Sequence, residues 1–360
     1  MRRWFAKFLV GACVVALAGC GSGSPSAPAK SPDKAADAPA KAAEPAAAPK
    51  VETMTVKVGS TEKAALKNLP MFLTGFPEAA GVKVEYQEYK GGSEVAKALL
   101  NGEIDMAFVA VDQVLKDKSG EFRLVAMVTN GPGQALLVDS KLKESIKSVK
   151  DLAGKTVGVS SLGSGPHKTL TQLLTANGID PKSVQVLPVG NNANEVLGTG
   201  KVAAMVTIEP YITLAEQSGK GVVLVDARKP DGIKAIYGTP EVPWIGLVTK
   251  TSVIQQNPAA VERMVSLVVK SLKYMAEAQA ADVAKKAPSF FKEEVGGDDT
   301  AFAKMWDGNK VTFSKNGAIS REALGAQWKD LQASGSVNKD QAFPFEQLTD
   351  TKFLDKVSSN

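Results

Sequence analysis

Histidine and cysteine, the side chains that most often bind metals or attack substrates, are rare in this chain. Its 360 residues include one histidine, His167, and two cysteines, Cys13 and Cys20. Metal sites built from these residues and histidine-based triads need several such groups in one place, and the sequence does not supply them. We therefore predict no catalytic residue, no metal site and no cofactor, although chemistry based on serine, lysine or glutamate alone stays open.

Small polar turns are the next feature that could do chemistry. Three of them combine glycine with serine or threonine, at 59–61, 91–93 and 160–165. Each follows a predicted strand and precedes a predicted helix, whose amino terminus favours the oxygens of a sulfonate, nitrate or carboxylate. Each could equally be a simple connection. The third turn lacks the lysine of a phosphate-binding loop and the third glycine of a dinucleotide fingerprint.

Candidate ligand-binding residues lie in these turns and near the ends of other predicted strands. They are Ser60, Thr61, Gly92, Ser93, Val111, Asp112, Ser160, Ser161, Gly163, Ser164, His167, Glu209 and Trp244. Three of them have open alternatives. His167 could donate a hydrogen bond to an anion or have no role, and Glu209 could accept one from an amine or only cap a helix. Trp244 could cover a ligand as a lid or pack between two lobes.

The elements that would position these residues alternate between strand and helix. Apolar patterning predicts strands at 54–58, 82–86, 104–110, 122–128, 156–159, 184–189, 202–206 and 222–225. It predicts helices at 64–74, 94–100, 166–177, 194–197 and 211–218. After Trp244 we expect helices only, a long one at 257–280 and short ones beyond it. This alternation indicates parallel sheets covered on both faces.

The amino terminus has the features of a secretory signal. A basic start precedes an apolar run at 8–18, which is too short to cross about 30 Å of hydrocarbon. Leu17-Ala18-Gly19-Cys20 resembles the lipobox of bacterial lipoproteins, which implies cleavage before Cys20 and lipidation of that residue. An ordinary secreted protein with a chance cysteine is the alternative. We expect a signal peptide at 1–19 and a lipidated Cys20 that begins a disordered Ala/Pro/Lys tether at 20–52.

The charge balance argues against a nucleic-acid partner. The formal net charge is +5, and removal of Arg2, Arg3 and Lys7 with the signal lowers it to +2. The basic residues are scattered, so no long basic block is present that could bind phosphates.

Several motifs of the body together resemble one family of transport proteins. Gly91-Gly92-Ser93 and the segment 101–105 resemble its first-lobe signature, 149–159 resembles the start of its second lobe, and Gly163-Ser164 with Glu209-Pro210 resembles a ligand region. On these motifs, residues 54–356 resemble the substrate-binding proteins of ABC importers for nitrate, alkanesulfonates, taurine and thiamine-pyrimidine precursors. Ala203 departs from the family pattern, which usually has aspartate there.

The resemblance implies an α/β fold, the type II periplasmic-binding-protein fold. Each of two lobes would contain a mixed, mainly parallel sheet flanked by helices, and a helical carboxyl-terminal tail would lie on lobe one. Lobe one would comprise 53–132 and 243–360, and lobe two 133–242. The segments 131–133 and 239–243 would connect the two lobes.

The function implied is that of an extracytoplasmic solute-binding component of an ABC importer. Such a protein traps a small, anionic or zwitterionic solute between its lobes and delivers it to a permease, whose ATPase is a separate chain. We expect a monomer, anchored to a bacterial membrane through Cys20, that is not an enzyme. The alternatives are a sensory binding protein that does not transport, or an enzyme of the same fold acting on a pyrimidine-like precursor.

Overall fold

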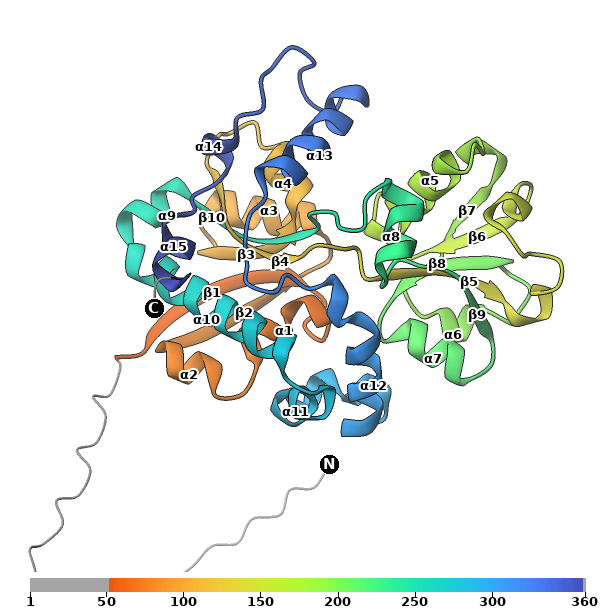
Figure 1. Cartoon of the computed structure of the whole chain (residues 1–360), viewed down its shortest axis with the longest axis horizontal. Coiled ribbons are helices and arrows are strands. Elements are labelled where there is room, and N and C mark those ends of the chain that lie inside the picture. The colour runs from red at the N-terminus through yellow and green to blue at the C-terminus, as the bar shows by residue number, and fades with distance from the viewer. Residues whose placement is uncertain (1–51, 359–360) are drawn as a thin grey trace, which may run out of the picture. The chain divides into compact units, whose positions relative to one another are not determined.

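A computed structural model of the chain describes residues 52–358 (Figure 1). The predictions for the signal peptide at 1–19, for lipidation at Cys20 and for nearly all of the tether fall outside the described residues. Within the described part, no helix combines the length and apolar character needed to span a bilayer.

Ten strands form two five-stranded sheets, each flanked by helices (Figure 1). The first sheet has the order β2-β1-β3-β10-β4. Its strands are β1 (Met54–Thr61), β2 (Val82–Tyr89), β3 (Met106–Ala110), β4 (Phe122–Thr129) and β10 (Ile245–Lys250). The second sheet has the order β7-β6-β8-β5-β9. Its strands are β5 (Gln134–Asp139), β6 (Thr156–Val159), β7 (Gln185–Pro188), β8 (Ala204–Ile208) and β9 (Gly221–Asp226).

The two sheets are built on the same plan, which confirms an α/β fold with two lobes. In each sheet three strands pair in parallel, and one strand pairs antiparallel with both of its neighbours. The antiparallel strand is β10 in the first sheet and β5 in the second. We call each sheet with the helices packed on it a lobe.

The expectation that only helices follow Trp244 is wrong, because β10 lies at Ile245–Lys250. Strand β5 was not predicted from the sequence either. All six residues of β5 and the first five of β10 are buried, so neither strand alternates between apolar and polar residues. A short apolar run that is buried on both faces shows no hydrophobic periodicity, so periodicity alone cannot identify it as a strand. The two missed strands are the ones that pair antiparallel with both neighbours, and each is fourth in the order of its sheet.

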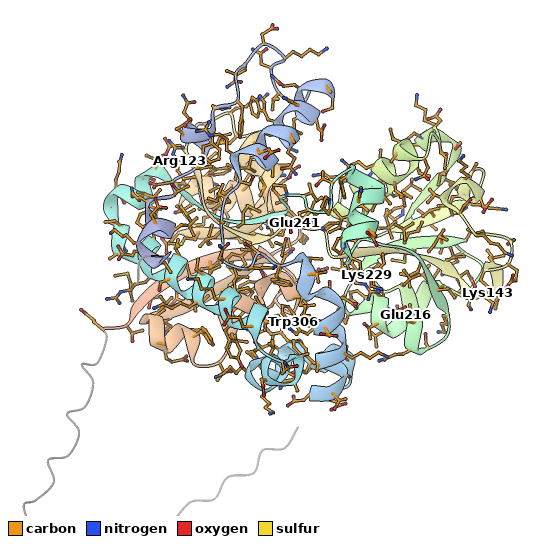
Figure 2. The ribbon with its side chains drawn as sticks, viewed as in Figure 1. Arg123, Lys143, Glu216, Lys229, Glu241 and Trp306 are labelled. Carbon is orange, nitrogen blue, oxygen red and sulfur yellow. The ribbon has the colours of Figure 1, made fainter. Side chains whose placement is uncertain are left out.

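The helices of the first lobe cover its sheet, and most of them come from the carboxyl-terminal part of the chain. They are α1 (Leu69–Phe72), α2 (Phe76–Ala80), α3 (Gly92–Asn101), α4 (Val111–Leu115), α9 (Thr251–Gln256), α10 (Pro258–Glu277), α11 (Ala280–Lys286), α12 (Asp299–Asn309), α13 (Arg321–Ala333), α14 (Phe345–Leu348) and α15 (Lys352–Ser358). The long α10 buries ten side chains and packs against the first sheet, α15, α2 and α1. Trp306 of α12 is fully buried in the same core (Figure 2).

The helix predicted at 64–74 is a 3-10 helix, η1 (Leu66–Asn68), followed by the short α1. Pro70 stands near the start of α1, where its missing N–H costs no hydrogen bond, so the chain restarts a helix there instead of continuing one.

The second lobe is made from the middle of the chain. Its helices are α5 (Gly165–Ala176), α6 (Ala193–Val196), α7 (Tyr211–Gln217) and α8 (Pro230–Tyr237). The chain enters this lobe between Thr129 and Gln134 and leaves it between Tyr237 and Ile245. The two connecting segments run side by side, because the Val242 N–H donates to the Asn130 carbonyl at 2.9 Å. Figure 2 labels Glu241 on the returning segment.

Candidate solute-binding cleft

An open cleft of about 1510 Å³ lies between the two lobes, and both contribute to its walls. Eleven of the thirteen candidate residues line it: Thr61, Gly92, Ser93, Asp112, Ser160, Ser161, Gly163, Ser164, His167, Glu209 and Trp244. In both sheets the parallel strands end at the cleft, since helix-leading turns after β1, β2 and β6 all line it.

Ser60 and Val111 do not line the cleft, which corrects their placement in the candidate set. Ser60 is fully buried, and its hydroxyl donates to the Phe108 carbonyl at 3.0 Å. Val111 is buried in an apolar cluster of the first lobe. Ser60 points away from the cleft because side chains alternate along β1 and its neighbour Thr61 lines the cleft. Val111 is the first residue of α4 and packs into the lobe, while the next residue, Asp112, lines the cleft.

The first-lobe wall offers unpaired backbone donors at the start of α3. Gly91 is the N-cap, and the N–H groups of Gly92 and Ser93 have no protein acceptor among the described residues. Such groups at a helix amino terminus can donate to an anion.

The second-lobe wall is a turn held together by its own hydrogen bonds. Ser164 caps α5 by accepting from the His167 N–H, and its hydroxyl donates to the Ser161 carbonyl at 2.7 Å. The Gly163 N–H donates to His167 Nδ1 at 2.8 Å, and Gly163 has φ +78°, which favours glycine. With Nδ1 accepting, a neutral His167 carries its proton on Nε2 and can donate through that atom.

Lys168 and Asn191 of the second lobe make polar contacts with the first lobe across the cleft. Lys168 of α5 places its ammonium 2.6 Å from Asp112 Oδ2, which also accepts from Lys116 at 2.6 Å. The Asn191 amide donates to Glu62 Oε1 at 2.6 Å. Burial alone would raise the pKa of the Asp112 carboxyl, but the two lysines outweigh burial and the pKa lies below its ordinary value.

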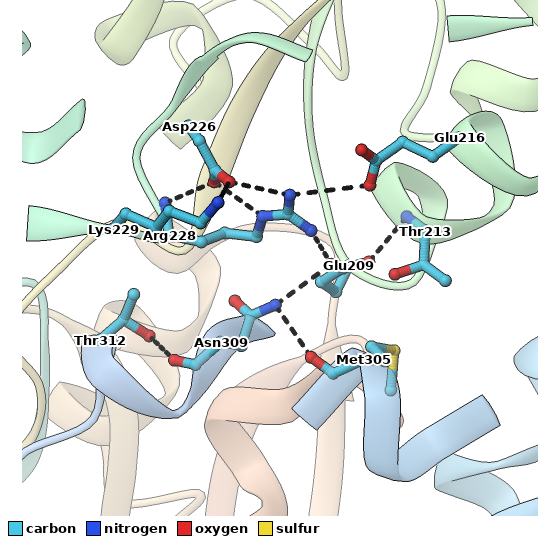
Figure 3. Close-up of polar contacts among 9 residues, drawn as sticks. All are labelled: Glu209, Thr213, Glu216, Asp226, Arg228, Lys229, Met305, Asn309 and Thr312. Carbon is cyan, nitrogen blue, oxygen red and sulfur yellow. Dashed lines mark hydrogen bonds and ion pairs between the residues drawn. The ribbon is translucent and has the colours of Figure 1, made fainter. Parts of the chain in front are cut away.

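Glu209 caps a helix, as one alternative predicted, and also joins a buried network (Figure 3). Its Oε2 accepts from the Thr213 N–H at 3.0 Å, and Oε1 lies 2.6 Å from Arg228 Nη1. Oε1 also accepts from Asn309 Nδ2 of the first lobe at 3.2 Å. Burial raises the pKa of the Glu209 carboxyl, while Arg228 opposes that rise. Arg228 is held in turn by Asp226, at 2.7 Å from its Nε.

Trp244 packs between the two lobes, as one alternative predicted, whereas its role as a lid over a ligand stays a prediction. Its ring packs against the cores of both lobes and stands edge-on to Tyr237, with ring centroids 6.0 Å apart. It also lines the cleft, close enough to α5 that a Cβ on Gly165 would lie 3.5 Å from its Cζ2.

Sequence reasoning missed several polar residues of the cleft. Four of them have side-chain oxygens that are buried without a hydrogen bond among the described residues: Gln134 Oε1, Asn191 Oδ1, Asn192 Oδ1 and Gln327 Oε1. Oδ1 of the candidate Asp112 is buried in the same way. Asn191 and Asn192 follow β7, so the strand-end rule could have found them. Lys67 also lines the cleft, but it lies within η1 and not directly after a strand, so the strand-end rule would not have found it. In residues 52–358 no group of histidine, cysteine or acidic side chains is arranged to hold a metal.

Comparisons with known proteins agree with this architecture. A family model described as NMT1/THI5 like matches residues 74–281. A comparison with curated proteins found no match.

Three solved structures illustrate the likeness of fold. A protein from Bordetella bronchiseptica RB50 has a TM-score of 0.70 and 22% identity, over 85% of this chain and 97% of that one. The periplasmic aliphatic sulphonate binding protein SsuA from Escherichia coli has a TM-score of 0.61 and 17% identity, over 82% and 97%. The desulfurization enzyme DSZB has a TM-score of 0.60 and 14% identity, over 85% and 99%. At these identities the likeness concerns the fold, which is that of periplasmic binding proteins.

Proposed function

Because the chain belongs to the NMT1/THI5-like family, we propose that it is the extracytoplasmic solute-binding component of an ABC importer. It would trap a small anionic or zwitterionic solute between its lobes and deliver it to a permease. The observation that carries this proposal is the cleft itself, which both lobes line with small polar turns and with buried oxygens that lack a protein partner.

The lining suggests how both charges of a zwitterion could be bound. The free amides of Gly92 and Ser93 suit the oxygens of a sulfonate, nitrate or carboxylate. The unpaired Asp112 Oδ1 and Gln134 Oε1 suit a donor such as an ammonium group. An amino sulfonate such as taurine would satisfy both sets, and a simple sulfonate only the first.

Closure of the lobes would follow from contacts that the solute makes with both. A ligand shifts an equilibrium between open and closed forms only by its extra affinity for one of them. The side-by-side connecting segments would act as the hinge between lobe one, at 53–132 and 243–360, and lobe two, at 133–242.

Further features of the proposal concern the cell. The chain would be a monomer, synthesised with a signal peptide at 1–19, lipidated at Cys20 and tethered to a bacterial membrane by 20–52. A separate ATPase would drive its permease, since a phosphate-binding loop is missing from the sequence.

An enzyme of the same fold is the second candidate, favoured by the similarity to DSZB. Incubation of the purified protein with each bound solute, followed by mass spectrometry of that solute, separates the two: a binding protein returns it unchanged.

A thermal-unfolding panel tests the proposed function. The solutes would be nitrate, ethanesulfonate, taurine, bicarbonate and a pyrimidine precursor. A solute present at 100 times its Kd should add about 2.7 kcal/mol to the free energy of unfolding. If no solute of low mass changes either the stability or the shape of the protein, the proposed function is wrong.

A further inference from the structure

Four lysines line the cleft, and they differ in what neutralises them. Lys116 and Lys168 share the Asp112 carboxylate, each at 2.6 Å. Lys90 is exposed to solvent. Lys67 is half-buried, and no carboxylate among the described side chains forms an ion pair with it.

The surroundings of Lys67 leave most of its hydrogen-bonding capacity unused. It belongs to η1, just after β1, and its ammonium donates to Thr61 Oγ1 at 2.5 Å. An ammonium carries three N–H donors, and no second acceptor is present for Lys67 among the described residues.

The two nearest carboxylates have other partners. Glu62 accepts from Asn191 of the second lobe, and Glu88 accepts from the Lys63 N–H at 3.0 Å. Burial lowers the pKa of Lys67, and the attraction of Glu62 and Glu88 only partly offsets this effect. The ammonium is therefore a cation short of negative charge.

A partly buried cation without a carboxylate partner costs free energy, which an anion bound next to it would recover. Thr61, the acceptor of Lys67, lines the cleft beside it. The unpaired amides of Gly92 and Ser93 line the same lobe's wall, and α3 packs on β1. Charged and neutral donors thus come from two elements of one lobe.

We propose that Lys67, with the hydroxyl of Thr61, binds the anionic group of the solute, which is therefore an oxyanion such as a sulfonate, carboxylate or nitrate. This inference rests on the proposed function. It also assigns the anion to the first lobe, so the open protein would capture the charged end first and the second lobe would close over the remainder.

The test replaces Lys67 by Met and by Gln in the full chain, with Lys63→Met as the matched control. Lys63 is exposed, lies four residues away outside the cleft, and its replacement changes net charge equally. Binding would be measured by calorimetry with acetate, ethanesulfonate, taurine and nitrate, and with acetamide and dimethyl sulfone as neutral counterparts. Losing one member of a buried charge pair weakens binding by at least about 30-fold.

We expect wild type and Lys63→Met to bind an oxyanion equally, and both Lys67 variants to lose at least 30-fold in affinity. The unliganded Lys67→Met protein should unfold at the same urea concentration as wild type or higher, because it no longer buries an unpaired cation. A residue with only a structural role would show the opposite pattern.

Two results would overturn the inference, and they differ from failure of the proposed function. One is binding of an oxyanion that both Lys67 variants retain within about threefold, and the other is preference of the wild type for acetamide or dimethyl sulfone. Either result leaves a solute receptor with another means of recognition. Absence of binding to these probes and to the remaining solutes of the thermal-unfolding panel refutes the proposed function and, with it, the role of Lys67.

Discussion

Replacement of Arg228 by Met should destabilise the protein more than removal of any exposed ion pair. Arg228 is 8% exposed and lies between three carboxylates, those of Glu209, Asp226 and Glu216 (Figure 3). Methionine keeps much of the apolar stem but supplies no donor. Glu209, whose side chain is 2% exposed, would keep only the Thr213 N–H and the Asn309 amide.

The expected loss in the free energy of unfolding follows from the buried carboxylate of Glu209, which remains after Arg228 is replaced. Breaking a buried ion pair from one side costs about 3–5 kcal/mol, because the remaining charge is desolvated without compensation. Burial already raises the pKa of Glu209, so loss of Arg228 should raise it further and favour the protonated carboxyl. The double variant Arg228→Met/Glu209→Gln removes that stranded charge and should cost less than the two single changes added together, by about 1–2 kcal/mol.

Lys229→Met is the matched control. Lys229 pairs with Asp226 (Figure 3) at 3.3 Å. Its side chain is 66% exposed, and exposed pairs contribute at most about 1 kcal/mol. This variant removes one positive charge from the same cluster, so it separates the effect of burial from that of net charge.

Urea unfolding of the full chain at pH 7, followed by far-ultraviolet circular dichroism, measures these effects. With a denaturant slope of about 3 kcal/mol per M, the Arg228→Met midpoint should fall by about 1–2 M and the Lys229→Met midpoint by less than about 0.3 M. Equal shifts for the two variants, or strict additivity in the double variant, would refute the argument from buried charge.

Two further predictions concern the walls of the cleft. Asp112→Asn removes the carboxylate that holds Lys168 across the cleft. Because the pKa of Asp112 is lowered in the folded protein, its contribution is present above the ordinary aspartate pKa of about 3.9 and is lost as the pH falls through the lowered value. The variant should therefore lose less stability than wild type between about pH 5 and 2, by at most about 1 kcal/mol in thermal unfolding. Ser164→Ala removes the cap of α5 and should lower the free energy of unfolding by about 1 kcal/mol while weakening solute affinity.

Each of these predictions has a control outside the cleft. Asp307→Asn removes an exposed carboxylate paired with Lys310, and it should leave the loss of stability at acidic pH unchanged. Ser320→Ala removes the cap of α13, so it should cost the same stability as Ser164→Ala without a change in affinity. An Asp112→Asn protein with the acid sensitivity of wild type, or a Ser164→Ala protein with wild-type affinity, would contradict the corresponding argument.

Local patterning predicted most parallel strands and the main second-lobe helix closely. The strand expected at 156–159 is β6, and the helix expected at 166–177 is α5, at Gly165–Ala176. These elements depend on residues close in sequence, such as the Ser164 cap and the apolar face that follows it. The strands β5 and β10 were not predicted because both are buried on both faces and pair with partners far away, as Ile245 does with Ala110.

The sequence predicted where most of the candidate residues lie, but it did not predict which charged and polar groups of the cleft lack a partner. Turns after strands of a parallel sheet must meet at one edge, so eleven of the thirteen residues reached the cleft. The residues missed there include Lys67 and Gln134, and their significance lies in the partners they lack. Nothing local to either residue reveals that absence.

The sequence by itself determined most of the strands and helices and the positions of the small polar turns, because hydrophobic period, helix caps and glycine conformation act over a few residues. Only the tertiary structure decided which charges meet. Lys168 pairs with Asp112, 56 residues away, and Arg228 pairs with Glu209, 19 residues away, whereas Lys67 forms an ion pair with no carboxylate among the described side chains. The interaction of two charges depends on their separation and burial, which the folded chain sets by bringing distant segments together.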